Sequence, residues 1–275
     1  MPGEWEEPLL EHLGIEETTA TRAIITGDPE RTSRIAERLG ESRELTRRRG
    51  LLCHEAHTAH GPILVVATGI GAPATAIVVE ELAELGCHTI IRLGSCGAIQ
   101  AHLRPGHLVV STGCVRDEGT SRQYIDTSFP AVPDVKLTHV LIDELSRSQV
   151  PLHFGITHCK DAYYLERPAS QLRPDAMADY WRTLRRAGVL VTEMESSTLF
   201  VLGSLRGLRT AGVFLNVGAV NEPEKLNRAL EVAVDAIGRA LEKVPAPSAR
   251  FPKTPVKTAN TARSYLDREF YEGDP

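Results

Sequence analysis

The sequence contains no long apolar run. Its longest strongly apolar stretches, residues 63–67 and 212–215, are far shorter than the roughly 20 residues that an α-helix needs to cross a bilayer. The N-terminus also lacks the basic segment followed by an apolar segment that marks a signal peptide. We therefore expect a soluble protein of the cytoplasm with no membrane partner.

The sequence also lacks closely spaced cysteines of the kind that bind metal, and it has no excess of basic over acidic residues. The five cysteines are Cys53, Cys87, Cys96, Cys114 and Cys159. They form no C-x-x-C pair of the kind that holds zinc or works as a redox couple, so we expect no metal site and a reducing compartment. The formal net charge of −5 excludes an overall electrostatic footprint for nucleic acid, although residues 47–49 are three consecutive arginines. Any anion that the protein binds is expected to be small.

What the sequence does contain is a repeated strand, turn and helix pattern. With 275 residues, 42% of them hydrophobic and 24% charged, the chain can bury the core of one large α/β domain. Strand and helix patterns alternate along its first part, which indicates a mixed or largely parallel sheet covered by helices. The strand runs are residues 23–25, 62–67, 88–93 and 108–111, and the helices are residues 31–39 and 74–85.

The second part of the chain continues this pattern and then changes in composition. Its expected elements are helices at 181–187 and 192–202, a buried strand at 210–217 and a long amphipathic helix at 226–244. From 245 to 275 the apolar residues are sparse, which is typical of a poorly packed polar tail. We expect one domain over residues 1–244, followed by a tail over 245–275 that has no catalytic role.

Chemically useful residues lie at the ends of the expected elements, where open α/β sheets place their sites. Gly27 and Arg31 flank a helix start that can hold an oxyanion, although a tight turn with a surface arginine gives the same pattern. Arg92 lies in a run that reads as an interior strand, so it needs either an anion or a carboxylate partner in a structural salt bridge. Glu193 and Glu195 lie at an expected helix start, where the helix dipole alone would also favour them.

One glycine-rich segment argues against a dinucleotide cofactor. Residues 68–74 partly imitate the G-x-G-x-x-G fingerprint, but Ala74 stands in place of the third glycine. No acidic residue follows a strand at the expected distance. We therefore expect no cofactor.

Seven short segments form an ordered set. They are His12-Leu13-Gly14, Gly27-Asp28-Pro29-Glu30-Arg31, Arg49-Gly50, Thr68-Gly69-Ile70-Gly71-Ala72-Pro73, Glu80-Glu81-Leu82, Arg92-Leu93-Gly94-Ser95-Cys96-Gly97-Ala98-Ile99-Gln100 and Glu193-Met194-Glu195-Ser196. In order and spacing, over about residues 12–244, they resemble the uridine phosphorylase branch of the hexameric nucleoside phosphorylases. This resemblance implies a single three-layer α/β/α domain around a mixed, twisted sheet. It also implies homodimers, which commonly assemble into a hexamer, a trimer of dimers.

The same resemblance implies a phosphate site, a sugar site and a base site. The phosphate-binding residues would be Gly27, Arg31, Arg92 and Ser95, with Arg49 reaching in from a neighbouring subunit. The ribose-binding residues would be Glu193, Met194 and Glu195, with His12 from the partner chain at the 5′ end of the sugar; an ordinary surface histidine is the alternative for His12. The base-binding residues would be Cys96, Gly97, Tyr163, Glu166 and Arg167. The residues expected to carry catalysis are Arg92 and Glu195.

The implied reaction is phosphorolysis of a pyrimidine nucleoside, either uridine or a modified uridine. Inorganic phosphate, the co-substrate, attacks C1′ and yields free base and pentose 1-phosphate. Arginines orient the phosphate dianion, and the dianion and Glu195 stabilise a transition state with oxocarbenium character, so neither a metal nor a covalent enzyme intermediate is required. A nucleoside hydrolase on the same fold would use water and need no converging arginines. A protein that only binds would be expected to lose Glu195 or the arginines.

Two segments depart from the family's pattern near the base. Where relatives supply a glutamine, and some an arginine, this chain has Leu165-Glu166-Arg167. An ionised Glu166 only accepts hydrogen bonds, so it suits uracil N3–H but repels the carbonyl oxygen, and Arg167 would restore the missing donor. A nucleoside with an extra amino group, for instance a 5′-modified pyrimidine nucleoside, is the alternative. Residues 215–221 contain no acid where purine-cleaving relatives place an aspartate, which argues against purines.

Overall fold

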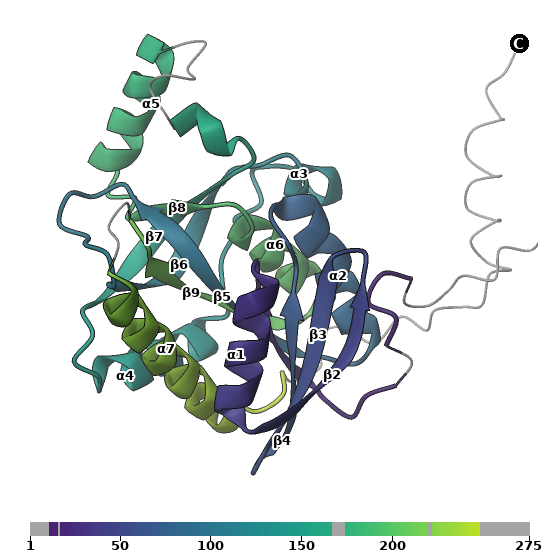
Figure 1. Ribbon diagram of the computed structural model, residues 1–275. Helices are drawn as coiled ribbons and strands as arrows, with labels where there is room; N and C mark the ends of the chain where they lie inside the picture. Colours follow the sequence, from purple (N-terminus) through teal and green to yellow (C-terminus); the bar gives the residue numbers. More distant parts are fainter. Residues whose placement is uncertain (1–10, 16, 167–173, 219–221, 248–275) are drawn as a thin grey trace, which may run out of the picture.

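A nine-stranded mixed sheet forms the centre of the molecule (Figure 1). The computed structural model describes residues 11–15, 17–166, 174–218 and 222–247. The strand order is β2-β3-β4-β1-β5-β8-β7-β6-β9, and β9 also pairs with β5, so the last five strands of this order close on themselves. The strands are β1 (Arg22–Thr26), β2 (Glu41–Arg48), β3 (Leu51–Thr58), β4 (Gly61–Ala67), β5 (Thr89–Ala98), β6 (Leu108–Asp117), β7 (Leu152–Lys160), β8 (Val191–Glu193) and β9 (Arg209–Asn216).

Helices cover both faces of this sheet, which confirms the expected α/β/α layering (Figure 1). On one face α1, α4 and α7 share a core that includes Ile35, Leu141 and Ile237. On the other face α2 and α6 pack through residues such as Leu82 and Phe200. The helices are α1 (Pro29–Leu39), α2 (Ala72–Glu84), α3 (Ser121–Tyr124), α4 (Val135–Ser146), the 3-10 helix η1 (Tyr163–Glu166), α5 (Pro174–Arg186), α6 (Ser196–Arg206) and α7 (Pro223–Lys243).

Helix α1 begins at Pro29, two residues before its expected start at Arg31, and Asp28 caps it. The Asp28 side chain accepts a hydrogen bond from the Glu30 N–H at 2.9 Å, and Pro29 occupies the first turn, where a missing N–H leaves no bond unmade. Ile35 is fully buried in the core shared with α7. The helix is thereby fixed over the sheet, and Arg31 reaches β5 from its first turn.

Several expected boundaries were wrong. The helix α5 begins at Pro174 instead of Trp181, and the strand β6 continues to Asp117 instead of ending at Ser111. The strand β5 continues to Ala98 instead of ending at Leu93, because β8 and β9 both pair with its second half. Glu193 ends the strand β8 and does not open a helix, since it lies opposite Cys159 of β7. The helix α6 therefore begins at Ser196, four residues later than expected at Thr192.

Seven elements were not among those expected from the sequence: β2, β3, β7, β8, α3, α4 and η1. The strands β2 and β3 form an antiparallel hairpin around residues 49–50, and β2 is largely exposed, so it carries little apolar alternation. The strand β7 is half exposed over residues 152–156 and buried only near its end. A strand that is partly exposed in this way is hard to distinguish from a loop by hydrophobic periodicity.

The last helix of the described part of the chain is α7. This helix ends at Lys243, close to the end of the amphipathic pattern expected over 226–244. The expected tail lies outside the described residues from 248 onward. In the described ranges, no helix combines the length and the apolar character that crossing a membrane requires.

A buried carboxylate joins α4 to α7. Glu144 is 1% exposed, and its oxygens accept hydrogen bonds from Arg239 Nε at 2.7 Å and from Lys243 Nζ. Arg147 lies 3.1 Å from the same carboxylate. The hydrogen bonds from Lys243 and Arg239 lower the pKa of Glu144 to about 2. The ionised form of Glu144 therefore stabilises the contact between these two helices.

We expect Glu144→Gln to lower the free energy of unfolding by about 1–2 kcal/mol at neutral pH, since the half-exposed cations weaken the pair through solvent screening. Because the folded pKa lies below the ordinary value of 4.5, this contribution is present above pH 4.5 and is lost as the pH falls towards about 2. Urea denaturation of both proteins near pH 7 and near pH 3 measures the difference. Asp143→Asn, at an exposed position of the same helix, is the control. An equal difference at both pH values would contradict the assignment.

Candidate active site

The carboxyl ends of three parallel strands meet at one edge of the sheet. Ile25 of β1 lies opposite Arg92 of β5, and β1 also pairs with β4. Gly27, which follows β1, and the turn 68–71, which follows β4, therefore come together beside β5. A Cβ atom on Gly27 would lie 3.1 Å from the carbonyl oxygen of Gly69. Glycine at position 27 thus lets the two turns approach closely.

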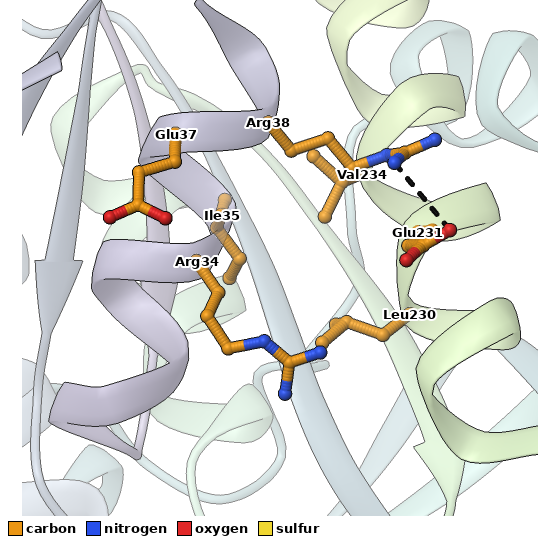
Figure 2. Close-up of a pocket in the computed structure, with 7 residues that line it drawn as sticks. All are labelled: Arg34, Ile35, Glu37, Arg38, Leu230, Glu231 and Val234. Carbon is orange, nitrogen blue, oxygen red and sulfur yellow. Dashed lines mark ion pairs between the residues drawn. The ribbon is translucent and has the colours of Figure 1, made fainter. Parts of the chain in front are cut away.

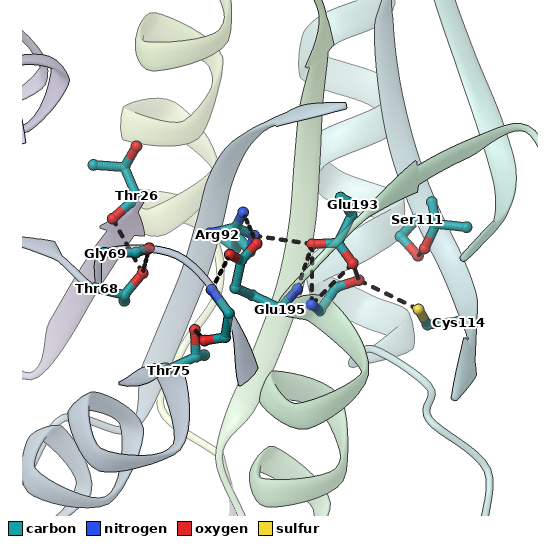
Figure 3. Close-up of polar contacts among 12 residues, drawn as sticks. Thr26, Thr68, Gly69, Thr75, Arg92, Ser111, Cys114, Glu193 and Glu195 are labelled. Atoms are coloured by element: carbon teal, nitrogen blue, oxygen red, sulfur yellow. Dashed lines mark hydrogen bonds and ion pairs between the residues drawn. The ribbon is translucent and has the colours of Figure 1, made fainter. Parts of the chain in front are cut away.

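Arg92 is buried between two carboxylates (Figure 3). Its side chain is 4% exposed, its Nε donates to Glu193 Oε2 at 3.2 Å, and its Nη2 donates to Glu195 Oε2. The guanidinium folds over Gly94, where a Cβ atom would lie only 2.9 Å from Nη2. Burial disfavours the charged guanidinium, but the charges of Glu195 and Glu193 outweigh it and raise the pKa of Arg92. The arginine in the strand therefore stays protonated and has carboxylate partners.

One nitrogen of Arg92 has no partner among the described residues. Its Nη1 atom is buried and makes no hydrogen bond there. Nearby, Arg31 Nη2 donates to Ser95 Oγ at 2.8 Å. Burial, with a further effect from the charge of Arg92, lowers the pKa of Arg31. A bound anion would relieve the repulsion between the two arginines and accept from the free donor.

Glu193 and Glu195 are held by different groups. Glu193 accepts from the Glu195 N–H at 3.0 Å, and from the N–H and the hydroxyl of Ser196 at 3.0 and 2.5 Å. Glu195 Oε1 accepts from the Gly71 N–H at 2.6 Å, where the backbone has φ +100°. Burial, reinforced by the charge of Glu193, raises the pKa of Glu195. Glu195 is thus a carboxylate whose ionised state depends on Arg92.

The single chain assembles most of the expected phosphate and sugar residues, but it does not bring Arg49 or His12 to them. Arg49 lies in the β2–β3 turn at φ 51°, is 59% exposed and pairs with Glu11 at 3.2 Å. His12 Nδ1 lies 2.8 Å from Glu81 Oε1 of α2. The residues that lie together at the sheet edge are Gly27, Arg31, Arg92, Ser95, Glu193, Met194 and Glu195.

The expected base residues are only partly described. Cys96 is buried in β5, and Gly97 pairs with Thr192 of β8. Tyr163 is 49% exposed, and its ring stands edge-on to that of Tyr164 with centroids 5.3 Å apart. The backbone of Glu166 ends η1, whereas Arg167 lies outside the described residues. The roles of these two residues in reading the uracil edge therefore stay predictions.

Three further residues contribute to this site without having been assigned a role from the sequence. Gly71 holds Glu195 and Ser196 holds Glu193, and both residues lie in segments that carry the family resemblance. Lys160 is 6% exposed, and its Nζ donates to Thr192 Oγ1 at 2.8 Å. Its contact joins β7 to β8, and no local spacing signals a pairing between strands that are distant in sequence.

Two surface pockets lie apart from this cluster. The larger, of about 290 Å³, lies between α1 and α7, where Arg38 and Glu231 pair at 3.5 Å (Figure 2). The smaller, of about 140 Å³, is lined by residues that include Arg116 and Asp161. Neither is lined by Arg92 or Glu195. The candidate site is therefore identified by its side chains.

Comparison with known proteins agrees with this arrangement. A family model described as the phosphorylase superfamily matches residues 21–244. A uridine phosphorylase from Treponema pallidum is 38% identical over 215 residues, which cover 75% of this chain and 81% of that protein. A guanosine phosphorylase from Halorubrum lacusprofundi is 34% identical over 243 residues, which cover 82% of this chain and 97% of that protein.

Solved structures show the same similarity in three dimensions. The crystal structure of a uridine phosphorylase from Vibrio fischeri matches with a TM-score of 0.75 and 32% identity. The match covers 87% of this chain and 98% of that one. The resemblance noted from the seven segments and the expected fold class are both confirmed. This chain belongs to the phosphorylase superfamily.

Proposed function

We propose that this protein cleaves a pyrimidine nucleoside, uridine or a modified uridine, with inorganic phosphate to give free base and pentose 1-phosphate. One observation carries the proposal: the buried Nη1 of Arg92 has no partner among the described residues and lies near the Arg31–Ser95 pair. Such a set of donors fits a phosphate dianion. A hydrolase would activate water and would not need two arginines that repel each other. The uridine phosphorylases from Treponema pallidum and Vibrio fischeri support the same reaction.

The contacts suggest how each residue acts. Arg31, Arg92 and Ser95 hold phosphate so that an oxygen attacks C1′, which removes much of the entropic barrier. Glu195 accepts from the sugar hydroxyls, and its charge, together with that of the phosphate, stabilises the oxocarbenium character of the transition state. Arg92 contacts both Glu193 and Glu195. It therefore couples the phosphate side of the site to the sugar side.

The reaction proposed here needs phosphate as co-substrate and no other cofactor. Hydrogen bonds to the carbonyl and N3–H groups of the pyrimidine would spread the charge of the departing base, with Tyr163 packing on its ring. Glu166 and Arg167 would read the uracil edge. The five cysteines occur as free thiols, which fits a site of action in the cytoplasm.

In the proposed enzyme, residues from a neighbouring copy of the chain complete the active site. Arg49 and His12 lie on surface segments that do not meet Arg92 within one chain. In a homodimer, or in a hexamer of three dimers, Arg49 would reach the phosphate and His12 the 5′ end of the sugar. The exposed guanidinium of Arg49 pairs with the exposed Glu11 at the surface, and such a pair is weak enough to be exchanged for a phosphate.

We expect Arg49→Ala to raise the KM for phosphate about tenfold or more, because a hydrogen bond to a charged group contributes roughly 1.5–3 kcal/mol. Arg47→Ala is the matched control, since Arg47 lies in the same hairpin, is 60% exposed and pairs with Glu44. Steady-state kinetics at varied phosphate measures both variants. An unchanged KM in Arg49→Ala would exclude Arg49 from the phosphate site.

Chromatography tests the function directly. Purified protein is incubated with uridine, thymidine, 2′-deoxyuridine, cytidine, inosine and guanosine, each with and without phosphate. Phosphate-dependent release of uracil together with pentose 1-phosphate is expected. Release of uracil without phosphate would instead show a hydrolase. Cleavage of only inosine or guanosine would overturn the pyrimidine assignment, and no cleavage at all would overturn the proposal for common nucleosides.

A further inference from the structure

Two cysteines that are far apart in sequence lie beside one of the active-site carboxylates. Cys114 lies on β6 and Cys159 on β7, which pairs with β6 in parallel, and Glu193 of β8 lies directly opposite Cys159. The two sulfur atoms and one carboxylate oxygen all lie within 4.8 Å of one another. Among the described residues, no other three His, Cys, Asp or Glu side chains are grouped in this way.

The spacing suits a soft divalent metal ion after a small closure. Zinc binds thiolate sulfur at about 2.3 Å and carboxylate oxygen at about 2.0–2.2 Å, so tetrahedral ligand atoms lie roughly 3.5–3.8 Å apart. Two thiolates and a carboxylate provide three ligands and leave one position open, which is typical of an accessible site and not of a closed structural one. Thiolate ligands select zinc and its heavier relatives over magnesium or calcium.

A fourth candidate ligand atom, the hydroxyl oxygen of Ser196, lies beside these three. The Ser196 hydroxyl is 2.5 Å from Glu193 Oε1 and 3.4 Å from Cys114 Sγ. It already bridges the carboxylate and one thiol, so it can complete the coordination or hydrogen-bond to a coordinated atom. Cys159 is fully buried, whereas Cys114 is partly exposed and offers a route of entry.

We propose that Cys114, Cys159 and Glu193 form a binding site for a soft divalent metal ion of the zinc and cadmium class, and that its occupation inhibits the enzyme. Binding forms two metal–sulfur bonds and one metal–oxygen bond, and each thiol releases one proton to solvent. The metal ion would coordinate Glu193, whose Oε2 accepts a hydrogen bond from Arg92 Nε at 3.2 Å. Metal binding itself is independent of the proposed function, whereas the inhibition depends on it.

Cadmium is the probe, because cadmium–thiolate bonds absorb in the ultraviolet and cadmium–histidine bonds do not. This distinction matters because His107 Nδ1 and His153 Nε2 lie 3.0 Å apart at the surface and can bind metal as well. Untagged, metal-free protein is kept reduced with a thiol-free reductant and titrated with Cd²⁺. The wild type is expected to show a thiolate charge-transfer band that saturates at one ion per chain.

The variants Cys114→Ala and Cys159→Ala are each expected to weaken Cd²⁺ binding by about 100-fold or more, since loss of an outer-shell partner alone costs 10–100-fold. Cys87→Ala removes a buried thiol that lies outside this group of ligands and contacts the carbonyl oxygen of Ala20, so this variant should bind like the wild type. Circular dichroism confirms that each variant folds, and the partly exposed Cys114 is the safer of the two sites. A wild type without the band, or a band that persists in Cys114→Ala, would overturn the site.

Activity measured in the same titration separates the two proposals. Uracil release by the wild type should fall as the band saturates and recover on chelation, while Cys114→Ala should resist the same Cd²⁺ concentration by at least tenfold. If the band forms but phosphorolysis continues at full rate, the metal site stands and the inhibitory role is overturned. If no phosphorolysis is found in metal-free protein, the proposed function fails while the band still tests the site.

Discussion

Arg92→Ala is expected to reduce phosphate-dependent turnover by about 10²–10³-fold, the typical effect of losing one charged donor at a transition state. The substitution removes the buried Nη1 donor and the positive charge between Glu193 and Glu195. The loss should be seen in kcat/KM for phosphate, measured by uracil release at varied phosphate concentration.

The same substitution should also destabilise the fold. It leaves two buried carboxylates without their shared cation, and breaking a buried pair in this way costs roughly 3–5 kcal/mol. Activity must therefore be normalised to the folded fraction at each temperature. Arg47→Ala, which removes an exposed arginine of β2, is the control and should change neither turnover nor stability strongly. Near-wild-type turnover by folded Arg92→Ala would remove Arg92 from the phosphate site.

Glu195→Gln is expected to lower kcat by about 10²–10³-fold while leaving the protein folded. The amide retains the shape of the carboxylate but loses the negative charge that would face the oxocarbenium-like sugar. Arg92 keeps Glu193 as a partner, so the variant does not strand a buried charge. Burial raises the pKa of Glu195, so the folded protein holds this proton more tightly than the unfolded chain.

The raised pKa of Glu195 makes both the stability and the turnover of the protein depend on pH. For a carboxyl with a raised folded pKa, the stabilisation is present below the ordinary pKa and is lost as the pH rises through the folded value. Between mildly acidic and neutral pH, the free energy of unfolding of Glu195→Gln should therefore fall less than that of the wild type. The wild type should lose kcat on the acid side at a higher pH than an ordinary glutamate would cause. A variant that kept full kcat would exclude Glu195 from catalysis, and Glu224→Gln, at an exposed position of α7, is the control.

Much of the candidate site could be predicted because its residues lie in local motifs. The corner from Asp28 to Arg31 combines a cap, a proline and an arginine within one turn, and the structure forms that helix start. Arg92 in an apolar run pointed to a buried charge for the same local reason. The roles of these residues toward phosphate and sugar remain predictions until the kinetics are measured.

Other features could not be predicted because they depend on which strands become neighbours. The pairing of Glu193 with Cys159 turned an expected helix start into the end of a strand. The contact between Gly71 and Glu195 spans 124 residues, and no periodicity in either segment reports on the other. The polar hairpin of β2 and β3 lacks the apolar alternation by which a strand is recognised.

The sequence by itself determined the class of fold and the chemical types present at the edge of the sheet. Alternating apolar runs and capped helices leave few arrangements other than helices packed over a mixed sheet. Only the tertiary structure decided that Arg92 lies between Glu193 and Glu195 with one donor unpaired, and that Cys114 approaches Cys159. Local patterns fix which face of each element is buried, whereas strand register fixes which buried side chains meet.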